Sequence, residues 1–385
     1  MLLNGSIKND HRVIKMINTL SKKALVDLYY INGSSSDNDL FNENVYLFSF
    51  KHKNSIKRKF LKNSFFCFEF NYFIKKVLKK NKSYNYIWSN DLPTLYSSFK
   101  LSKKLNAKLI YDSHEIYIET LNQFFPENNR IFKRIIFKIL LKFMKIHGLK
   151  IEKKCINKVQ TFVTVNESLQ NYFIKKYKLK NCISIMNYPE STFANKQAID
   201  FRKKYNWSKS DIILIYQGTI NKGRGLDILI ESLKITPSNY KLVIIGDGTI
   251  KENLIQKTKE LQICNKVKFI NKVPINELHS YSAGADIGIN LLENYNLSKK
   301  LASPNKLFEY IHAEIPVLCS DTIENKNILS KYKIGLLTNN NSKEILNTIT
   351  NFSLENLNTY KYSLILAKKE FVWEKQERKI LSLIK

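Results

Sequence analysis

The stretch "IILIYQGTINKGRGLDILIESL", residues 212–233, joins an apolar segment to an amphipathic one through a glycine-rich turn. Residues 212–217 are almost continuously apolar, which is typical of a strand covered on both faces of a sheet. Residues 225–233 repeat apolar side chains at helical spacing. A buried strand followed directly by a helix is the repeating unit of a parallel α/β sheet.

The same alternation of strand and helix continues in both directions along the chain. Helices about ten residues long are predicted between short apolar runs, for example over residues 11–22, 92–105, 250–261 and 275–283. Further strands are predicted at residues 26–31, 45–50, 86–89, 108–111, 161–165, 183–186, 241–245, 267–270, 287–290 and 317–319.

The alternation is interrupted once, at Asn187-Tyr188-Pro189-Glu190 and the polar residues up to about Trp207. Proline after a strand, followed by a polar segment, is typical of a linker. We therefore predict two Rossmann-like α/β domains that face each other across a cleft. The first covers residues 1–188 and is joined by the C-terminal helix at about 370–385, and the second covers residues 189–369.

The composition is strongly basic, with 63 Lys and Arg against 33 Asp and Glu and a formal net charge of +30. Such an excess favours an anionic partner: nucleic acid, an anionic membrane surface or a phosphorylated substrate. A general enrichment in lysine, isoleucine and asparagine is the alternative source of part of the charge. Charge alone does not decide among these partners.

The cysteines and the apolar runs indicate the compartment. No apolar run reaches the roughly 18 residues that a membrane span needs, and residues 1–15 have too short an apolar core for a signal peptide. The cysteines form no CxxC pair, a pattern typical of a reduced protein without a disulfide framework or zinc site. We expect a cytoplasmic protein, soluble or peripheral on a membrane. The five cysteines are Cys67, Cys155, Cys182, Cys264 and Cys319.

A second stretch, "SPNKLFEYIHAEIPVL" at residues 303–318, combines helix-start signals with two charged side chains. We predict Ser303 as the N-cap and Pro304 as the first helical residue. The amides of residues 305–307 would then point out of the helix unpaired and, with Lys306 and the helix dipole, bind an anion.

Glu309 lies about one and a half turns further into this helix. A carboxylate there would repel phosphate but could accept hydrogen bonds from two vicinal hydroxyls. Phosphate at the helix start and a diol beyond it predict a nucleotide ribose diphosphate. The alternative is a well-capped amphipathic helix with an incidental glutamate.

The glycine-rich turn after residues 212–217 supports the first reading. Its glycines let the backbone approach a ligand closely, and Arg224 can clamp a diphosphate with two hydrogen bonds. Gly246-Asp247-Gly248 forms a second tight turn after the neighbouring strand at 241–245. Two such turns together with the helix start at Ser303 predict one diphosphate site in the second domain.

Several motifs, taken in order and spacing, resemble the family 4 glycosyltransferases of the GT-B fold. "YQGTINKGRGLDILIESL", "VIIGDG", "VKFINKVPINEL" and "SPNKLFEYIHAEIPVL" are similar to the C-terminal domain of that family. "NGSIKNDHRVIKMINTLSK" resembles its first glycine-bearing loop and helix, and "LIYDSHEIYIE" its active-site histidine loop. The resemblance spans most of the chain.

The resemblance implies a retaining glycosyltransferase that uses a nucleotide-diphosphate sugar and requires no metal or separate cofactor. A hexosyl or N-acetylhexosaminyl group would pass to a glycan or lipid-linked acceptor, in surface polysaccharide or glycolipid biosynthesis. Neither the base, the sugar nor the acceptor follows from the motifs.

The resemblance also implies roles for individual residues. Arg224 matches the basic residue that neutralises the departing diphosphate, and Glu309 matches the glutamate that holds the donor ribose. His114, with Glu115 beside it, matches a histidine that faces the donor sugar. Gly5 and Ser6 would close over the donor, and the backbone at Pro274 would bind the base. The other donor-binding residues that the resemblance implies are Gly218, Lys222, Ser303, Asn305, Lys306 and Leu307.

Three positions depart from the family pattern. Leu301 stands where a second glutamate is common, so the sugar contacts of that glutamate must come from elsewhere. Thr219 replaces a basic residue after the first glycine of the turn, which leaves Arg224 and Lys222 to carry the charge. Glu314 stands where glycine is usual, so we do not expect the ordinary glycine cap at that helix end.

Two features keep alternatives open. His114 in "DSHE" is either a sugar-positioning group or a histidine that only hydrogen-bonds its flanking carboxylates. The basic amphipathic stretch at 131–150, with Arg134, Lys138, Lys142 and Lys145 on one face, either lies on an anionic membrane or packs on the core with a solvated basic face. The stretch at 56–82 mixes basic and aromatic side chains in a similar way.

Competing functional classes are weighed on the same residues. A nucleotide- or nucleic-acid-binding protein without transferase activity would explain the charge, but no recognised nucleic-acid module is present, so nucleic acid is disfavoured as a partner. The Asp-x-Asp at residues 37–39 lies in a serine-rich loop and is a poor candidate for a metal site. A nucleotide-sugar epimerase of the same architecture would need acid and base carboxylates that are not evident.

Overall fold

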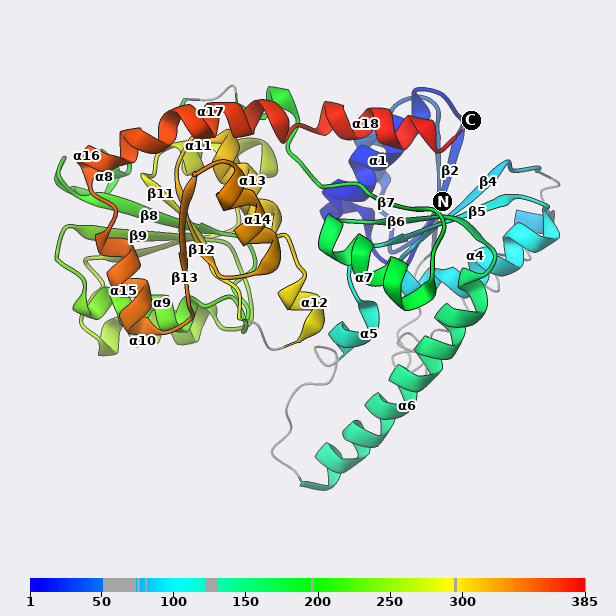
Figure 1. Cartoon of the computed structure of the whole chain (residues 1–385), viewed down its shortest axis with the longest axis horizontal. Coiled ribbons are helices and arrows are strands. Elements are labelled where there is room, and N and C mark those ends of the chain that lie inside the picture. The colour runs from blue at the N-terminus through cyan, green and yellow to red at the C-terminus, as the bar shows by residue number, and fades with distance from the viewer. Residues whose placement is uncertain are drawn as a thin grey trace. The chain divides into compact units, whose positions relative to one another are not determined.

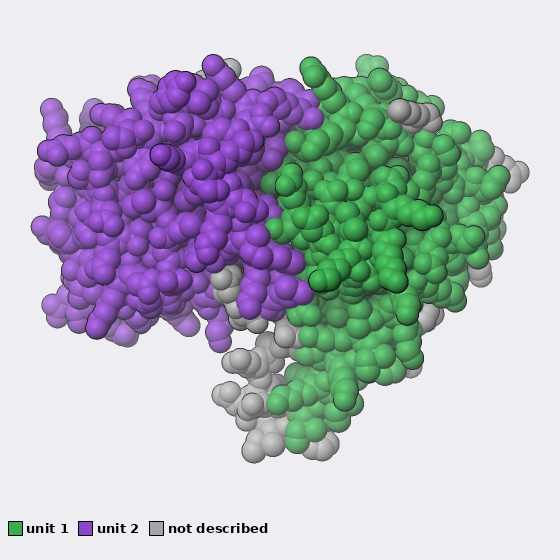
Figure 2. Space-filling model, in the orientation of Figure 1, with its two compact units in different colours: residues 1–186, 376–385 green, residues 187–375 purple. Residues whose placement is uncertain are grey.

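The computed structural model describes residues 1–50, 74, 77–79, 82–121, 131–194, 197–293 and 296–384, without the side chains of residues 9, 131–134 and 193–194. Two compact units make up the chain (Figures 1 and 2). Unit 1 comprises residues 1–186 and 376–385, and unit 2 comprises residues 187–375. Cys67 and most of the basic and aromatic stretch at 56–82 lie outside the described residues.

Unit 1 contains a parallel sheet in the order β3-β2-β1-β4-β5-β6-β7 within the described residues. The strands are β1 (Leu2–Leu3), β2 (Val26–Ile31), β3 (Val45–Phe50), β4 (Tyr86–Asn90), β5 (Lys108–Ser113), β6 (Val159–Thr164) and β7 (Cys182–Ser184). The helices are η1 (Ile7–Asn9), α1 (His11–Ser21), η2 (Ser35–Leu40), α4 (Asp91–Lys104), α5 (Tyr117–Thr120), α6 (Ile131–Ile156) and α7 (Glu167–Tyr177).

Unit 2 contains a second parallel sheet, in the order β10-β9-β8-β11-β12-β13. The strands are β8 (Ile212–Gln217), β9 (Tyr240–Ile245), β10 (Val267–Ile270), β11 (Ile287–Asn290), β12 (Val317–Ser320) and β13 (Gly335–Thr338). The helices up to α13 are η4 (Ser191–Ala194), α8 (Phe201–Tyr205), α9 (Leu226–Ile235), α10 (Lys251–Glu260), α11 (Ile275–Ala283), α12 (Leu297–Lys300) and α13 (Asn305–His312). The later helices are α14 (Ile323–Lys331), α15 (Ser342–Thr350), α16 (Leu354–Leu357), η5 (Asn358–Tyr360) and α17 (Lys361–Glu370). The last helix, α18 (Trp373–Ser382), begins in unit 2 and ends in unit 1.

The two sheets share one topology, which confirms two Rossmann-like units. In each sheet the chain builds outward in one direction from the first strand and then in the other, so the order reverses between β1 and β4 and between β8 and β11. In such sheets ligands bind beyond the carboxyl ends of the strands, at the point where the order reverses. The loops after β1, β4 and β5, and those after β8, β9 and β11, are therefore the places to look for a site.

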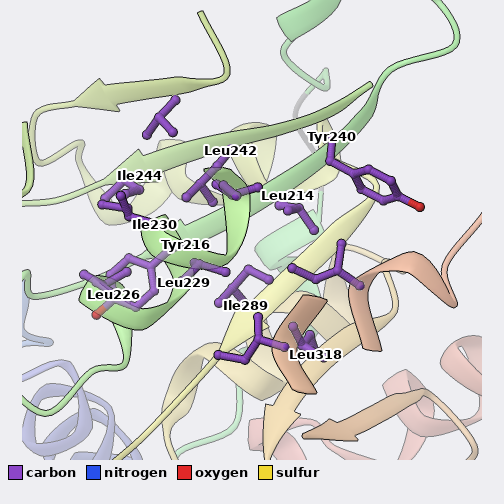
Figure 3. Close-up of a cluster of buried hydrophobic side chains, with 14 of the residues drawn as sticks. Leu214, Tyr216, Leu226, Leu229, Ile230, Tyr240, Leu242, Ile244, Ile289 and Leu318 are labelled. Carbon is purple, nitrogen blue, oxygen red and sulfur yellow. The ribbon is translucent and has the colours of Figure 1, made fainter. Parts of the chain in front are cut away.

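The core of unit 2 explains why the apolar runs form strands. Figure 3 shows side chains of β8, β9 and β11, including Leu214, Leu242 and Ile289, packed with Leu229 and Ile230 of α9. These five side chains are completely buried, at 0% relative exposure. Burying one such side chain stabilises the fold by roughly 1.5–3 kcal/mol, and the core fixes the strand ends that carry the site.

The unit boundaries differ slightly from the predicted ones. Residues 370–375, which we predicted in the first domain, belong to unit 2. The N–H of Trp373 donates to the carbonyl of Pro189 over 2.8 Å, and the ring of Phe371 lies 5.2 Å from that of Tyr188. The chain therefore returns to unit 1 only within α18, after the linker and this segment have packed together.

Candidate functional site

The start of α13 differs from the prediction. The helix begins at Asn305 with Pro304 as its N-cap, so Ser303 is not the cap. Pro304 is extended, with φ −66° and ψ 134°, and its carbonyl accepts the N–H of Leu307 over 3.2 Å. The amide of Leu307 is therefore paired, contrary to expectation. The buried hydroxyl of Ser303 has no hydrogen-bond partner among the described residues.

Lys306 lies in the first turn of α13 and is 8% exposed. Its Nζ lies 3.7 Å from the centroid of the Tyr216 ring, and no described residue accepts a hydrogen bond from it. Burial lowers the pKa of Lys306 well below its ordinary value; the charge of Arg224 lowers it further, whereas Glu309 raises it. Arg224 and Glu309 therefore both lie close enough to Lys306 to act on its charge.

The carboxylate of Glu309 is held by the end of β8. Gln217 Nε2 donates to Glu309 Oε2 over 2.5 Å, and Gln217 Oε1 accepts from the hydroxyl of Ser282 over 2.6 Å. The backbone N–H of Gln217 donates to the hydroxyl of Tyr310 over 3.2 Å. Gln217 is 1% exposed, so this chain of hydrogen bonds orients Glu309 from inside the sheet.

The glycine-rich turn after β8 is packed against the turn after β9. Gly218 and Gly246 have φ of 125° and 145°, a region that glycine favours. A Cβ on Gly246 would lie 1.9 Å from the carbonyl oxygen of Gly218, whereas a Cβ on Gly218 would meet nothing within 4 Å. The backbone of Gly218 therefore faces open space at the sheet edge, where a ligand has access.

Arg224 lies in the second half of this turn and is half-buried. The turn is pinned by Glu293, whose N–H donates to Gly223 O over 3.1 Å and whose Oε1 accepts the N–H of Gly225 over 3.3 Å. Three other residues singled out by the sequence, Lys222, Pro274 and Asn305, are exposed. Pro274 forms the N-cap of α11.

In unit 1, His114 lies between two carboxylates. Its Nδ1 is 3.3 Å from Asp91 Oδ2 and its Nε2 is 3.5 Å from Asp112 Oδ2. The backbone N–H of His114 also donates to Asp91 Oδ1 over 2.9 Å. Arg12, which is 6% exposed, pairs with the other oxygen of Asp112 over 3.1 Å.

These charges keep the imidazole protonated. Burial lowers the pKa of His114, but the negative charges of Asp91 and Asp112 outweigh it and raise the pKa to about 9. Burial raises the pKa of Asp91, whereas Arg12 and His114 overcome burial and hold the pKa of Asp112 below its usual range. An imidazolium donates hydrogen bonds but cannot accept a proton, so these charges favour a hydrogen-bond donor over a general base at His114.

The other unit 1 positions follow strands β1, β2 and β5 at the same sheet edge. Gly5 and Ser6 follow β1, and Ser6 is the extended N-cap of η1. Glu115 follows His114 and its carbonyl accepts the hydroxyl of Ser113 over 3.0 Å. Asp37 of the Asp-x-Asp is 1% exposed and accepts from Tyr30 and Ser34. Across the described part of the chain, no group of three or more His, Cys, Asp or Glu side chains is arranged to hold a metal ion.

Sequence reasoning missed several residues that complete these sites. Gln217 and Asp91 each stand at the carboxyl end of an apolar strand, where a polar side chain is a usable signal. Ser282, which fixes Gln217, and Arg12, which pairs with Asp112, lie on helices and carry no such signal. These partners become visible only when the sheet order is known.

Comparison with solved structures identifies the fold class of the chain. The fold is that of the GT-B glycosyltransferases: HepE of Anabaena, solved with UDP, superposes with a TM-score of 0.71 at 16% identity, covering 100% of this chain and 98% of that one. The lipopolysaccharide outer core galactosyltransferase WaaB, solved in its apo form, superposes with a TM-score of 0.63 at 13% identity, covering 99% and 98%.

Sequence comparison relates unit 2 to a glycosyl transferase family. Residues 197–363, most of unit 2, match the family described as "Glycosyl transferases group 1". TuaC of Bacillus subtilis (strain 168), named for a glycosyltransferase of teichuronic acid biosynthesis, is 20% identical over 207 residues. That match spans 53% of this chain and 50% of TuaC, about half of the relative's length.

Proposed function

We propose that the protein is a retaining, metal-independent glycosyltransferase that takes a hexosyl or N-acetylhexosaminyl group from a nucleotide-diphosphate sugar. The observation that carries the proposal is the convergence of Arg224, Lys306 and Glu309 beyond the carboxyl ends of the unit 2 strands. Two basic side chains beside one oriented carboxylate suit a diphosphate joined to a ribose. The group 1 family of unit 2 supports this assignment.

Each residue has a physical task in the proposed reaction. Negative charge builds on the diphosphate as the bond to the sugar breaks, and fixed cations at that position stabilise the transition state. Arg224 supplies a planar donor pair for two phosphate oxygens, and Lys306 with the first amides of α13 supplies further donors. Glu309, fixed by Gln217, accepts hydrogen bonds from the ribose hydroxyls.

In unit 1, we propose that His114 positions the donor sugar as a charged hydrogen-bond donor. The pKa of about 9 gives the ring two N–H groups at neutral pH. Its long contacts to Asp91 and Asp112, 3.3 and 3.5 Å, are weaker than direct charge-assisted hydrogen bonds. A sugar hydroxyl can therefore compete for one of them.

Donor binding and turnover test the proposal directly. UDP-, GDP- and dTDP-sugars should be screened for thermal stabilisation, because a ligand that prefers the folded state raises its melting temperature. With the donor that stabilises, Arg224→Ala and Glu309→Ala should lose most of the turnover while remaining folded. Arg378→Ala and Glu252→Ala, at exposed positions on α18 and α10, are the matched controls.

Near-normal turnover in both site variants would refute the assignment. Stabilisation by RNA or DNA, steeply dependent on salt, with no response to any nucleotide sugar, would favour the nucleic-acid alternative instead.

We further propose a glycan or lipid-linked acceptor at an anionic membrane surface, on the evidence of α6. Within the described residues, no helix is both long and apolar enough to cross a bilayer. In Figure 1, however, α6 extends beyond the other elements of unit 1. The C-terminal part of α6 packs on unit 1 through the buried side chains of Ile151, Glu152 and Cys155. The preceding turns expose the apolar side chains of Ile135, Ile136, Ile139, Phe143, Ile146 and Leu149.

Charge complementarity points to an anionic surface as the partner of this face. Lys138 and Lys142 are exposed on α6 beside Ile139 and Phe143, so apolar and basic side chains would meet the membrane interface together. The names of TuaC and WaaB refer to polymers of the cell surface, and this supports such an acceptor.

Vesicle binding tests the α6 proposal. The protein should co-sediment with vesicles that contain phosphatidylglycerol at low salt and much less with phosphatidylcholine alone. Ile139→Glu with Phe143→Glu should abolish the difference, whereas Ile235→Glu, at a 54% exposed position on α9, should not. Equal sedimentation with and without anionic lipid would refute the proposal.

A further inference from the structure

Among its described residues, unit 2 contains three buried lysines, and their surroundings differ. Lys266 is 9% exposed and donates to the carbonyls of Leu233, Thr236 and Pro237 over 3.0, 2.7 and 3.3 Å. Lys251 is 8% exposed and donates to Gly246 O and Asn271 Oδ1 over 3.2 and 2.6 Å. Lys306 is equally buried but has no hydrogen-bond acceptor among the described residues. A buried ammonium without acceptors is costly.

The charged groups around Lys306 come from four elements. Arg224, from the turn after β8, and Lys299, from α12, disfavour a positive charge on Lys306. Glu309, on α13 itself, favours one, but its Oε2 is already bound by Gln217. Cys319 of β12 has its pKa raised to about 12 by burial, so it is an uncharged thiol near neutral pH.

The Tyr216 ring also lies beside the amine of Lys306, with its centroid 3.7 Å from Nζ. A ring face attracts an ammonium, but it does not replace the hydrogen bonds that a buried ammonium loses. The hydroxyl of Ser303, likewise buried and without a partner in the described chain, lies in the same helix entry. Two unpaired polar groups at one helix start indicate a place that a ligand completes.

We infer that Lys306 is an uncharged amine in the ligand-free protein and takes up one proton from solvent when the diphosphate of a nucleotide binds. The inference rests on the proposed function, since it assumes a diphosphate at this site. The amine gains a proton and becomes an ammonium, and the incoming phosphate oxygens provide the acceptors that the empty site lacks. The proton comes from a buffer acid or hydronium ion in solvent, whose bond to that proton breaks as the new N–H bond forms, and no other covalent bond changes.

This proton coupling has a functional consequence. Without ligand, Arg224 carries a positive charge and Lys306 does not, so two like charges are not buried together. Lys306 becomes charged only when the anion binds. Binding then selects a multiply charged diphosphate over a neutral or singly charged nucleoside compound. The same coupling lowers the affinity for the nucleotide as pH rises, because binding takes up a proton and the proton concentration falls.

Calorimetric titration in buffers of different ionisation enthalpy measures the proton directly. UDP, GDP and dTDP should be tried at pH 8, where the terminal phosphate, with a pKa of about 6, is already ionised. The wild-type protein should take up close to one proton per nucleotide bound. Between pH 7.5 and 9 its association constant should fall by up to about tenfold per pH unit.

Lys306→Arg separates this effect from simple loss of charge. Arginine stays protonated throughout, so this variant should bind with proton uptake near zero and with a weaker pH dependence. Lys306→Met, which removes the amine altogether, should also show no uptake and covers the case in which arginine does not fit. Lys266→Arg, at the opposite end of the sheet, should keep the wild-type uptake. His279 and His312, whose pKa values are lowered by burial, stay neutral at pH 8.

The outcomes are distinguishable. Nucleotide binding without proton uptake, or with the same uptake in Lys306→Arg and Lys306→Met, overturns the inference and leaves the proposed function standing. Failure of all three nucleotides to bind overturns the proposed function, and the inference with it.

Discussion

Gln217 donates a hydrogen bond from its side-chain amide to Glu309 over 2.5 Å, which ties the last residue of β8 to the second turn of α13. Ser282 of α11 fixes the other end of the same amide. The proposed ribose ligand is therefore oriented by a residue that does not itself need to touch the donor. Gln217 is a positioning residue, and removing it should act through Glu309.

Gln217→Leu should weaken donor binding by roughly 10- to 100-fold, since a hydrogen bond to a charged group is worth about 1.5–3 kcal/mol. In a Glu309→Ala background the same change should add little, because the two residues act as one unit. Titration of the four proteins with the stabilising nucleotide sugar measures this coupling.

Gln256→Leu is the matched control for this prediction. Gln256 donates to Glu260 over 3.1 Å on the exposed side of α10, so it repeats the Gln–Glu pair away from the site. Its loss should cost only about 0.2–0.5 kcal/mol of stability and leave binding unchanged. Additive losses in the double variant Gln217→Leu/Glu309→Ala would contradict the positioning role.

The strands could be predicted from the sequence because buried parallel strands are nearly continuous apolar runs. Residues 212–217, 267–270 and 287–290 were predicted with the bounds that the structure shows. β13 was missed because Gly335 and Thr338 interrupt its apolar character, and it pairs on one side only, with β12. A short edge strand carries a weak signal, since only one neighbour defines it.

The site could be predicted only where its residues are close in sequence. Lys306 and Glu309 stand within one helix start, and Arg224 stands within one turn, so their spacing already points to an anion and a diol. Gln217 contacts Glu309 across 92 residues, and Arg12 contacts Asp112 across 100 residues. Such pairs are brought together by strand order, which no local pattern encodes.

The helix start at residue 303 was wrong by one position for a local reason. Ser303 is a strong N-cap by residue type, but Pro304 is extended and accepts the first helical N–H itself. Serine preference is a statistical guide, and here the extended backbone of Pro304 places the helix start one residue later. The hydroxyl of Ser303 stays buried without a hydrogen-bond partner among the described residues.

The charge on His114 should make the stability of unit 1 depend on pH. The folded pKa of about 9 lies above the ordinary value of 6.5, so the stabilisation is fully present below pH 6.5 and is lost as pH rises through 9. His114→Gln should therefore cost on the order of 3 kcal/mol near pH 6 and much less near pH 9.5. Urea unfolding at the two pH values, followed for wild type and variant, measures the difference.

His147→Gln is the comparison for His114. Burial lowers the pKa of His147 on α6, so the fold does not favour its charged form and replacing it should cost no more at pH 6 than at pH 9.5. A His114→Gln penalty that stays constant from pH 6 to 9.5 would show that the imidazole is not charged in the folded protein.

Glu314 closes α13 in the conformation that glycine usually adopts. Its φ is 57°, its N–H donates to Ile311 O over 3.1 Å, and Ile315 N–H donates to Tyr310 O over 3.2 Å. This is the glycine-type cap, which we did not expect with glutamate at that position. A salt bridge of 2.7 Å from Lys368 to Glu314 accompanies it.

Glu314→Gly should be more stable than Glu314→Ala by about 1 kcal/mol, because only glycine adopts this conformation without strain. Both variants lose the Lys368 pair, so their difference isolates the backbone effect. Ala313→Gly, one residue earlier at φ −79°, should instead destabilise by roughly 0.5–1 kcal/mol. Thermal unfolding of the three variants checks the opposite signs, and equal stability of Glu314→Gly and Glu314→Ala would contradict the strain.

Gly5 offers a test in which stability and function separate. A Cβ at Gly5 would meet nothing within 4 Å, whereas a Cβ at Gly33 would lie 2.4 Å from Ser49 Cβ. Gly5→Ala should therefore change stability by less than about 0.5 kcal/mol, while Gly33→Ala should lower it clearly.

If the loop at Gly5 and Ser6 approaches the donor as proposed, Gly5→Ala should still reduce turnover, because the added methyl group fills space that the donor needs. Melting temperature and initial rate, measured on the same preparation, separate the two effects. Unchanged turnover in a fully stable Gly5→Ala protein would remove Gly5 from the donor site.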